Sequence, residues 1–192
     1  MARPAPPAIA PSRLTAVAAV LRLGGLIAYP TDTVYGLGCL PDRPRAIRRL
    51  LALKGRPADK GLILLASEPA QLAPWTAPLT DADWARIADP AAPPTTWLVP
   101  AAPGVSPLVR GAHASVAVRL TRHALVAALT ALLGQPIIST SANPAGQPPV
   151  RRAADLDPAL RRGVDLVLAG ACGPATRPSR IRELASGRLL RA

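Results

Sequence analysis

Short apolar runs alternate along the chain with segments whose apolar residues recur at helical spacing. The runs have the length and composition of strands, and residues 115–120 (SVAVRL) also alternate between apolar and polar positions, as a strand with two different faces does. The predicted strands are residues 26–29, 61–65, 96–99, 115–120, 137–138, 164–168, 179–182 and 188–190.

Helical segments separate several of these runs. The predicted helices are residues 12–23, roughly 45–53, 70–75, 81–88 and the segment from 121 to 133. Ser12, Asp42 and Thr121 are the expected N-caps, because their side-chain oxygens can accept hydrogen bonds from free amides in the first turn. Gly24 and Gly134 are expected to end the first and last of these helices.

This alternation predicts an α/β layered fold, and the 192 residues suit a single compact domain. Residues 1–11 are rich in Pro and Ala and are expected to form a flexible arm ahead of a domain at 12–192. Ligands of open α/β sheets bind at loops beyond strand ends, so the polar loops are the expected place for a site.

Three polar loops are predicted at one edge of the sheet. They are residues 30–33 (PTDT), 54–60 (KGRPADK) and 139–143 (STSAN). Their hydroxyls, ammonium groups, guanidinium and amide suit recognition of phosphates and carboxylates. The chain has neither a GxxxxGK[ST] loop nor a well-placed GxGxxG after a strand. No base is evident beside Ser139 or Ser141, so a serine nucleophile is not indicated.

Lysine is almost absent from a chain rich in arginine. Of the 23 basic residues only Lys54 and Lys60 are lysine, which leaves 21 arginines by subtraction. The planar fork of arginine cannot replace a compact ammonium where a point charge must fit, so both lysines are candidate functional residues. The alternative is that two surface lysines have survived a compositional bias.

A formal net charge of +12 suggests an anionic partner, either RNA or a small phosphorylated substrate. The charge is spread along the chain, however, and solvated helix faces account for much of it. With only two cysteines, Cys39 and Cys172, neither a disulfide scaffold nor a structural metal site is expected. No segment resembles a signal peptide or a membrane span, so a cytoplasmic protein is predicted.

Four motifs resemble the YrdC/TsaC family of threonylcarbamoyl-AMP synthases. They are YPTDTVYGLGC at 29–39, KGRPADKGLILL at 54–65, SVAVRLTRHALV at 115–126 and PIISTSANPAGQPP at 136–149. Their order and spacing also agree with the family, and the likeness extends from about Ser12 to Ala192. The chain resembles the short, single-domain form, which lacks the extra C-terminal domain of some members.

The resemblance implies a twisted open mixed sheet with flanking helices around a concave basic cavity. It assigns Thr31, Arg119 and, more loosely, Ser179 to L-threonine, with Arg119 facing the carboxylate. The residues that it assigns or suggests for ATP are Lys54, Arg56, Lys60, Ser115, Ser139, Ser141, Asn143 and Arg191. Lys54 and Arg56 are also the catalytic candidates.

The implied reaction is adenylyl transfer from ATP to a threonine carbamate made with bicarbonate or CO2. The product serves the N6-threonylcarbamoyladenosine modification of tRNA, so tRNA or a threonylcarbamoyl transferase is an expected partner. Mg²⁺ is expected with ATP, but no dedicated carboxylate site for a metal is evident. The nucleophile comes from the substrates, so no covalent cofactor or residue is needed.

Several alternatives stay open at this stage. Thr31 could be a turn residue, Ser139 and Ser141 a strand end with a helix cap, and Lys54 with Arg56 part of a solvated basic loop. Residues 89–96 depart from a Trp-Pro-Gly-Pro run of the family, so the cavity wall there is expected to differ. The rival functions are a non-catalytic RNA-binding module and a carbamoyl-transfer domain like that of hydrogenase-maturation proteins.

Overall fold

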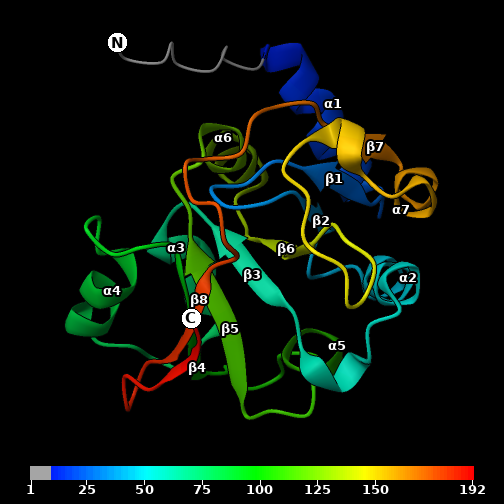
Figure 1. The fold of residues 1–192 in the computed structure, drawn as a ribbon. Coiled ribbons are helices and arrows are strands. Elements are labelled where there is room, and N and C mark those ends of the chain that lie inside the picture. Colours follow the sequence, from blue (N-terminus) through cyan, green and yellow to red (C-terminus); the bar gives the residue numbers. More distant parts are fainter. Residues whose placement is uncertain (1–9) are drawn as a thin grey trace, which may run out of the picture.

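A mixed nine-stranded sheet forms the centre of residues 10–192, the part of the chain that the computed structural model describes (Figure 1). The order across the sheet is β7-β1-β2-β6-β3-β5-β4-β8-β9. The strands are β1 (Ile27–Tyr29), β2 (Gly36–Gly38), β3 (Ile63–Ala66), β4 (Thr95–Pro100), β5 (Ser115–Leu120), β6 (Ile137–Ser141), β7 (Leu166–Val167), β8 (Arg180–Glu183) and β9 (Leu189–Arg191).

Parallel and antiparallel pairs are interspersed in this sheet. The pairs β1–β7, β3–β5 and β4–β8 are parallel. The pairs β1–β2, β2–β6, β3–β6, β4–β5 and β8–β9 are antiparallel. The predicted mixed α/β sheet with flanking helices is therefore confirmed.

Helices lie on both faces of the sheet. They are α1 (Pro11–Arg22), α2 (Pro44–Lys54), α3 (Pro69–Leu72), α4 (Asp81–Ala88), α5 (Pro107–Arg110), α6 (Ala124–Leu133) and α7 (Pro158–Gly163). Three short 3-10 turns accompany them at Ala58–Lys60, Ala73–Trp75 and Ala153–Asp155. None of the helices within residues 10–192 combines the length and the apolar character that crossing a bilayer requires.

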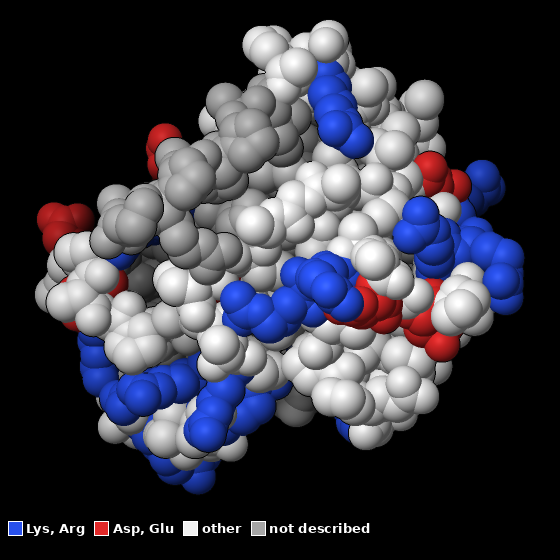
Figure 2. Space-filling view, turned by 45° about the horizontal axis from the view of Figure 1, so that its top comes forward, with Lys and Arg blue, Asp and Glu red and all other residues white. Residues whose placement is uncertain are grey.

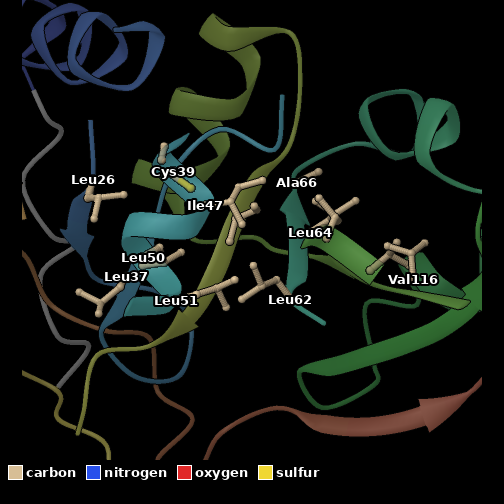
Figure 3. Close-up of a cluster of buried hydrophobic side chains, with 14 of the residues drawn as sticks. Leu26, Leu37, Cys39, Ile47, Leu50, Leu51, Leu62, Leu64, Ala66 and Val116 are labelled. Atoms are coloured by element: carbon tan, nitrogen blue, oxygen red, sulfur yellow. The ribbon is translucent and has the colours of Figure 1, made fainter. Parts of the chain in front are cut away.

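The larger hydrophobic core lies on the sheet face covered by α2, α5 and α7. Figure 3 shows Ile47, Leu50 and Leu51 of α2 among side chains that include Leu62 and Leu64. Ile47, Leu50 and Leu64 are fully buried. Each such side chain contributes about 1.5–3 kcal/mol relative to an exposed one, so α2 is held by its apolar face.

The opposite face is covered only in part, and this determines where a ligand can bind. Helices α1 and α6 bury Tyr29, Leu65 and Ile137 in a second core. Side chains two residues apart share a face of a strand. Ile63 and Ser139 are therefore on the same face as Leu65 and Ile137, but they line an open cavity instead. The helical cover ends between these positions.

Several predicted elements have the bounds that the structure shows, and one strand was missed. β5 and α4 agree with residues 115–120 and 81–88. β2 was not predicted, because its Gly-Leu-Gly sequence carries little strand signal. A Cβ atom on Gly38 would overlap the carbonyl oxygen of Ile138 and lie 2.9 Å from Tyr29 Cε1. Glycine is needed there because the Tyr29 ring and the next strand lie against the backbone.

The three predicted N-caps are wrong. Helix α1 begins at Pro11 with Ala10 as its cap, α2 with Arg43 and α6 with His123, and none of the three caps makes a side-chain cap hydrogen bond. Proline at the first position of α1 and α2 removes one of the amides that a cap would serve. The glycine end of α6 at Gly134 is confirmed, with φ 68°.

The expected arm at 1–11 falls largely on residues 1–9, which lie outside the described residues. At its other end, Pro11 already belongs to α1, so the helix starts one residue before the predicted domain boundary.

Candidate active site

A cavity of about 350 Å³ opens on the sheet face that α1 and α6 leave uncovered. Its size is that of a small-molecule site. Strands β2, β3, β5, β6, β8 and β9 all contribute to its wall. The lining residues with polar or charged side chains that the sequence had singled out are Thr31, Arg56, Lys60, Ser115, Arg119, Ser139, Ser141, Ser179 and Arg191.

The cavity wall combines one face of the sheet with the loops that carry Thr31, Arg56 and Lys60. The expectation of a loop at 139–143 is wrong for Ser139 and Ser141, which lie inside β6 on the face that carries Ile137. Ser115 and Arg119 likewise lie four residues apart on one face of β5. On this face β6 is apolar at Ile137, where α1 and α6 cover it, and polar at Ser139 and Ser141, where the cavity begins.

The cavity carries an excess of positive charge. Its wall includes Arg56, Lys60, Arg110, Arg119 and Arg191, and no Asp or Glu stands among the lining residues of the described chain. Burial lowers the pKa of Arg56 and of Arg191, and for Arg191 the nearby Arg119 and Arg56 add to the effect. Guanidinium groups crowded in this way favour an anionic ligand.

Within residues 10–192, Arg119 has one ionic partner and a buried donor without a hydrogen bond. Its residue is 5% exposed, and its Nη2 donates to Asp32 Oδ2 at 2.5 Å. Its Nε is buried without a hydrogen-bond partner. A buried donor without a partner is costly, and in native proteins it usually has a reason. A carboxylate entering the cavity is a suitable acceptor for it.

Thr31 combines a structural role with a place in the cavity wall. Its Oγ1 donates to Val34 O at 2.7 Å and accepts from the Thr33 amide at 3.1 Å. These bonds shape the turn between β1 and β2, so the turn interpretation is correct for this residue. The turn also brings both threonines to the cavity.

Lys54 and Asn143 lie beside the cavity and bind each other. Lys54 is in the last turn of α2, which Gly55 ends at φ 58°. Its Nζ donates to Asn143 Oδ1 at 3.0 Å and also to the Asn143 carbonyl. Burial, with a smaller effect of Arg56, lowers the pKa of Lys54 to about 8. Neither residue belongs to the cavity wall.

Arg56 and Lys60 stand on the turn that follows α2. The Nε and Nη2 of Arg56 donate to Gly61 O at 3.1 and 2.8 Å, which fixes the guanidinium at the cavity. Lys60 is exposed and lines the wall. The solvated-loop alternative therefore fits neither Lys54, which is buried in the last turn of α2, nor the half-buried Arg56, whereas Lys60 is a surface lysine.

The hairpin of β8 and β9 closes another side of the cavity. Ser179 is 3% exposed, and its hydroxyl lies 2.8 Å from Thr96 Oγ1. Arg191 donates from Nη2 to Ser179 O at 2.8 Å and from Nε to the same oxygen at 3.1 Å. Arg188, in the turn between the two strands, is not among the lining residues.

Sequence reasoning missed four residues of this region. Arg110 and His113 line the cavity, whereas Asp32 and Thr96 hold Arg119 and Ser179 from outside the wall. Asp32 stands within the quoted PTDT motif, so its position was a signal. Nothing in the sequence distinguishes Arg110 from the other arginines.

Metal-binding side chains do not gather in this region. Between residues 10 and 192 no group of three or more His, Cys, Asp or Glu residues could hold a metal ion. Cys39 is a buried free thiol and Cys172 a half-buried one.

Comparison with known proteins identifies related sequences over nearly the whole chain. The family model Sua5/YciO/YrdC, described as telomere recombination, matches residues 19–192. The threonylcarbamoyl-AMP synthase of Chromohalobacter salexigens is 50% identical over 179 residues, which cover 93% of this chain and 96% of the relative. That of Stenotrophomonas maltophilia is 45% identical over 181 residues, covering 93% and 97%.

Solved structures of similar proteins have the same fold as this chain. P. abyssi Sua5 complexed with L-threonine superposes with a TM-score of 0.82 at 27% identity, covering 92% of this chain. The chain spans about half the length of that protein, 52%. E. coli YciO, at 23% identity, shares the fold with a TM-score of 0.80 over 97% of this chain and 91% of its own. The chain therefore belongs to the Sua5/YciO/YrdC family.

Proposed function

We propose that the chain is a threonylcarbamoyl-AMP synthase, which forms threonylcarbamoyl-AMP and pyrophosphate from ATP, L-threonine and bicarbonate or CO2. The observation that carries this function is the cationic cavity with the buried, unpartnered Nε of Arg119 in its wall. Relatives of the chain at 45–50% identity bear this enzyme's name. The product serves the N6-threonylcarbamoyladenosine modification of tRNA.

Threonine is assigned to the part of the cavity formed by Thr31, Arg119 and Ser179. Arg119 receives the carboxylate, because its free Nε is a buried donor for an anion. The hydroxyls of Thr31 and Ser179 lie in the same wall and orient the amino acid. P. abyssi Sua5, which is 27% identical, has been solved with L-threonine bound.

ATP is assigned to the remaining cations and hydroxyls. Arg56, Lys60 and Arg191 neutralise the phosphates, while Ser115, Ser139 and Ser141 supply hydroxyls from β5 and β6. Lys54 and Asn143 stand beside the cavity wall, where their mutual bonds hold the segment that follows Ser141. Lys54 and Arg56 stabilise the charge that develops on the α-phosphate in the transition state.

The reaction needs positioning and electrostatics rather than a covalent residue. The neutral threonine amine adds to CO2 with loss of a proton, or condenses with bicarbonate with loss of water, and an oxygen of the resulting carbamate attacks the α-phosphorus and displaces pyrophosphate. A threonine ammonium among these cations is disfavoured, because like charges lower its pKa, and this promotes loss of its proton. Two anions that repel each other are held together by the common positive wall.

Mg²⁺ is treated as part of the nucleotide substrate. The lining residues offer no carboxylate for it within the described chain, and Asp32 is engaged by Arg119 and Thr121. No step is therefore assigned to a protein-bound metal. Because the reaction consumes ATP and serves tRNA modification, we place it in the cytoplasm, with tRNA or a threonylcarbamoyl transferase as the acceptor.

Pyrophosphate release by the purified protein tests this function. Release that requires ATP, threonine and bicarbonate together is expected, and release independent of threonine would contradict it. The rival function, a non-catalytic module for double-stranded RNA or tRNA, predicts no release and RNA binding that falls steeply with salt. The high identity to named synthases does not favour that rival.

A further inference from the structure

Asp32 stands between two cavity-lining residues but is not itself part of the wall. Thr31 and Thr33 face the cavity, while the Asp32 carboxylate binds two groups of the β5 end. Its Oδ2 accepts from Arg119 Nη2 and its Oδ1 from Thr121 Oγ1, both at 2.5 Å. Both oxygens of the carboxylate are therefore engaged on β5.

The ion pair is well sheltered from water. The side chains of Arg119 and Asp32 are 7% and 18% exposed. A buried guanidinium needs a counter-charge, and within residues 10–192 Asp32 forms the only salt bridge of Arg119. Solvent screens such a pair far less than a surface pair. The attraction between the two charges is therefore stronger, and it holds the two side chains in place.

A short chain of hydrogen bonds anchors Asp32 in turn. The amide of His123, at the start of α6, donates to Thr121 Oγ1 at 3.1 Å, and the Thr121 hydroxyl donates to Asp32. The helix that covers the second core is thus linked to the guanidinium in the cavity wall. The arrangement secures one end of the guanidinium and leaves Nε free.

We propose that Asp32 is a positioning residue that holds the Arg119 guanidinium by Nη2 so that its free donors receive the carboxylate of the amino-acid substrate. The proposal rests on the proposed function. Asp32 acts through Arg119 and does not touch the substrate. Its negative charge also offsets one of the five positive charges of the wall, which lets Arg119 remain buried before threonine arrives.

The variant Asp32→Asn tests this role with pyrophosphate release as the readout. The amide keeps the shape and an acceptor but loses the charge. We expect the KM for threonine to rise about tenfold, since a charge-assisted bond is replaced by a neutral one, while kcat and the KM for ATP stay within about twofold. An unchanged threonine KM in a folded, active variant would overturn the proposal.

A matched control is Asp165→Asn, which removes a carboxylate from another Asp–Arg pair, with Arg49, away from the cavity. Its kinetic constants are expected to equal those of the wild type. Equal changes in both variants would show that loss of any such pair perturbs the enzyme, which would also overturn the proposal.

A second readout separates positioning from mere support of the fold. Threoninol, which lacks the carboxylate, is used as a competitor of threonine in binding measurements. The ratio of the Kd for threoninol to the Kd for threonine should be large for the wild type and smaller for Asp32→Asn. An unchanged ratio contradicts the proposal. If Asp32→Asn fails to fold, Thr121→Val is used instead. This variant keeps the ion pair but removes the hydrogen bond that anchors Asp32. The same ratio of Kd values is measured, and a smaller change is expected.

The proposed function and the positioning role of Asp32 are contradicted by different results. If wild-type release does not depend on threonine, the proposed function is wrong. If it does depend on threonine and the Asp32 variants bind threonine as the wild type does, only the positioning role is wrong.

Discussion

Arg119 shows how a single strand position can carry a buried charge for a ligand. Its neighbours Val118 and Leu120 face the larger core, whereas Arg119 faces the cavity from the same strand. Period-two alternation places it there, and Asp32 makes its burial tolerable. The Nε of Arg119 thus stays a buried donor without a hydrogen-bond partner among the described residues.

Arg119→Lys is predicted to weaken threonine binding by about 10- to 100-fold, because the charge is kept and the planar fork is lost. The affinity for ATP should change little. Isothermal titration of each substrate measures both effects. Equal losses for ATP and threonine would show that Arg119 does not distinguish them.

Lys54 is predicted to make ATP binding sensitive to pH near 8. Its folded-state pKa is about 8, below its ordinary value, so the charge is present below that pH and is lost above it. A phosphate prefers the charged form, and ATP affinity should therefore fall as pH rises through about 8. Titrations from pH 7 to 10 measure this.

Lys54→Met serves as the control for this titration, because a neutral side chain of similar length removes the titrating group. Its ATP affinity should be lower at pH 7 and should show no inflection near pH 8. The same inflection in the variant would assign the titration to another group.

The sequence singled out candidate residues but not their arrangement. Residues 30–33, 54–60 and 139–143 and the two lysines stand out because few positions of this chain combine such side chains, yet the fold places Ser139 and Ser141 in β6 rather than in a loop. The orientation of the side chains could not be predicted from the sequence. Lys54, for example, points toward Asn143, which is 89 residues away in the chain. Asp32 was overlooked for the same reason, because only the fold brings Thr121 and Arg119 to it.

At the scale of elements, β2 is shaped by the ring of Tyr29. Gly38→Ala is predicted to destabilise the protein by about 1–3 kcal/mol, because its Cβ would overlap the Ile138 carbonyl and press on that ring. Urea unfolding measures the loss. Gly36→Ala is the matched control, since its Cβ would lie 3.2 Å from Ser139 Oγ and 3.3 Å from Tyr29 Cζ, and a smaller loss is expected. Equal losses would refute this account of β2.

Asp165 links α2 to the start of β1. Its Oδ2 accepts from the Leu26 amide at 2.6 Å and from Arg49 at 2.8 Å, and the hydrogen bonds from Arg49 chiefly hold its pKa below the ordinary value. The stabilisation is therefore present above the unfolded-state pKa, near 4, and is lost as pH falls through the lower folded-state value.

Asp165→Asn is predicted to lower the free energy of unfolding by about 1 kcal/mol at pH 7, since the pair is partly exposed and screened. The difference from the wild type should shrink as pH falls below 4. Denaturant titrations at several pH values measure it, and a difference that does not vary with pH would exclude the ionic contribution.

Element prediction succeeded where hydrophobic periodicity was strong and failed at element ends. β5 has clear alternation and was predicted with the observed bounds; α4 was also predicted with the observed bounds, although it lies in a less regular part of the sequence. The caps failed because Pro11, Pro44 and tertiary contacts, rather than the nearest Ser, Asp or Thr, determine where these helices start. β6 extends through Ser139–Ser141 because β2 and β3 pair with it there.

At the scale of the whole molecule, the residues behind the net charge of +12 come from many parts of the sequence. Figure 2 shows Lys and Arg side chains in several separate groups on the face in view, with fewer acidic side chains. The spread of charge expected from the sequence agrees with this view of one face. A separate set of positive charges, Arg56, Lys60, Arg110, Arg119 and Arg191, lines the cavity.

Ligand binding is predicted to stabilise the whole fold. ATP at about 100 times its Kd should add about 2.7 kcal/mol, which corresponds to a rise in Tm of roughly 5–10 °C for a chain of this size. Thermal denaturation with ATP, with threonine and with both measures this. Arg119→Lys should keep the response to ATP and lose most of the response to threonine.

The strand order also has a consequence for synthesis on the ribosome. Ile27 pairs with Leu166, and Thr95 pairs with Arg180. β1 and β4 are therefore synthesised long before β7 and β8, the strands with which they pair. Pairing across such separations is slow, and the emerging chain carries unpaired strand edges during elongation. Catalytic competence should thus arise only after β8 and β9 have been translated, and nascent chains arrested before that point should be inactive and dependent on chaperones.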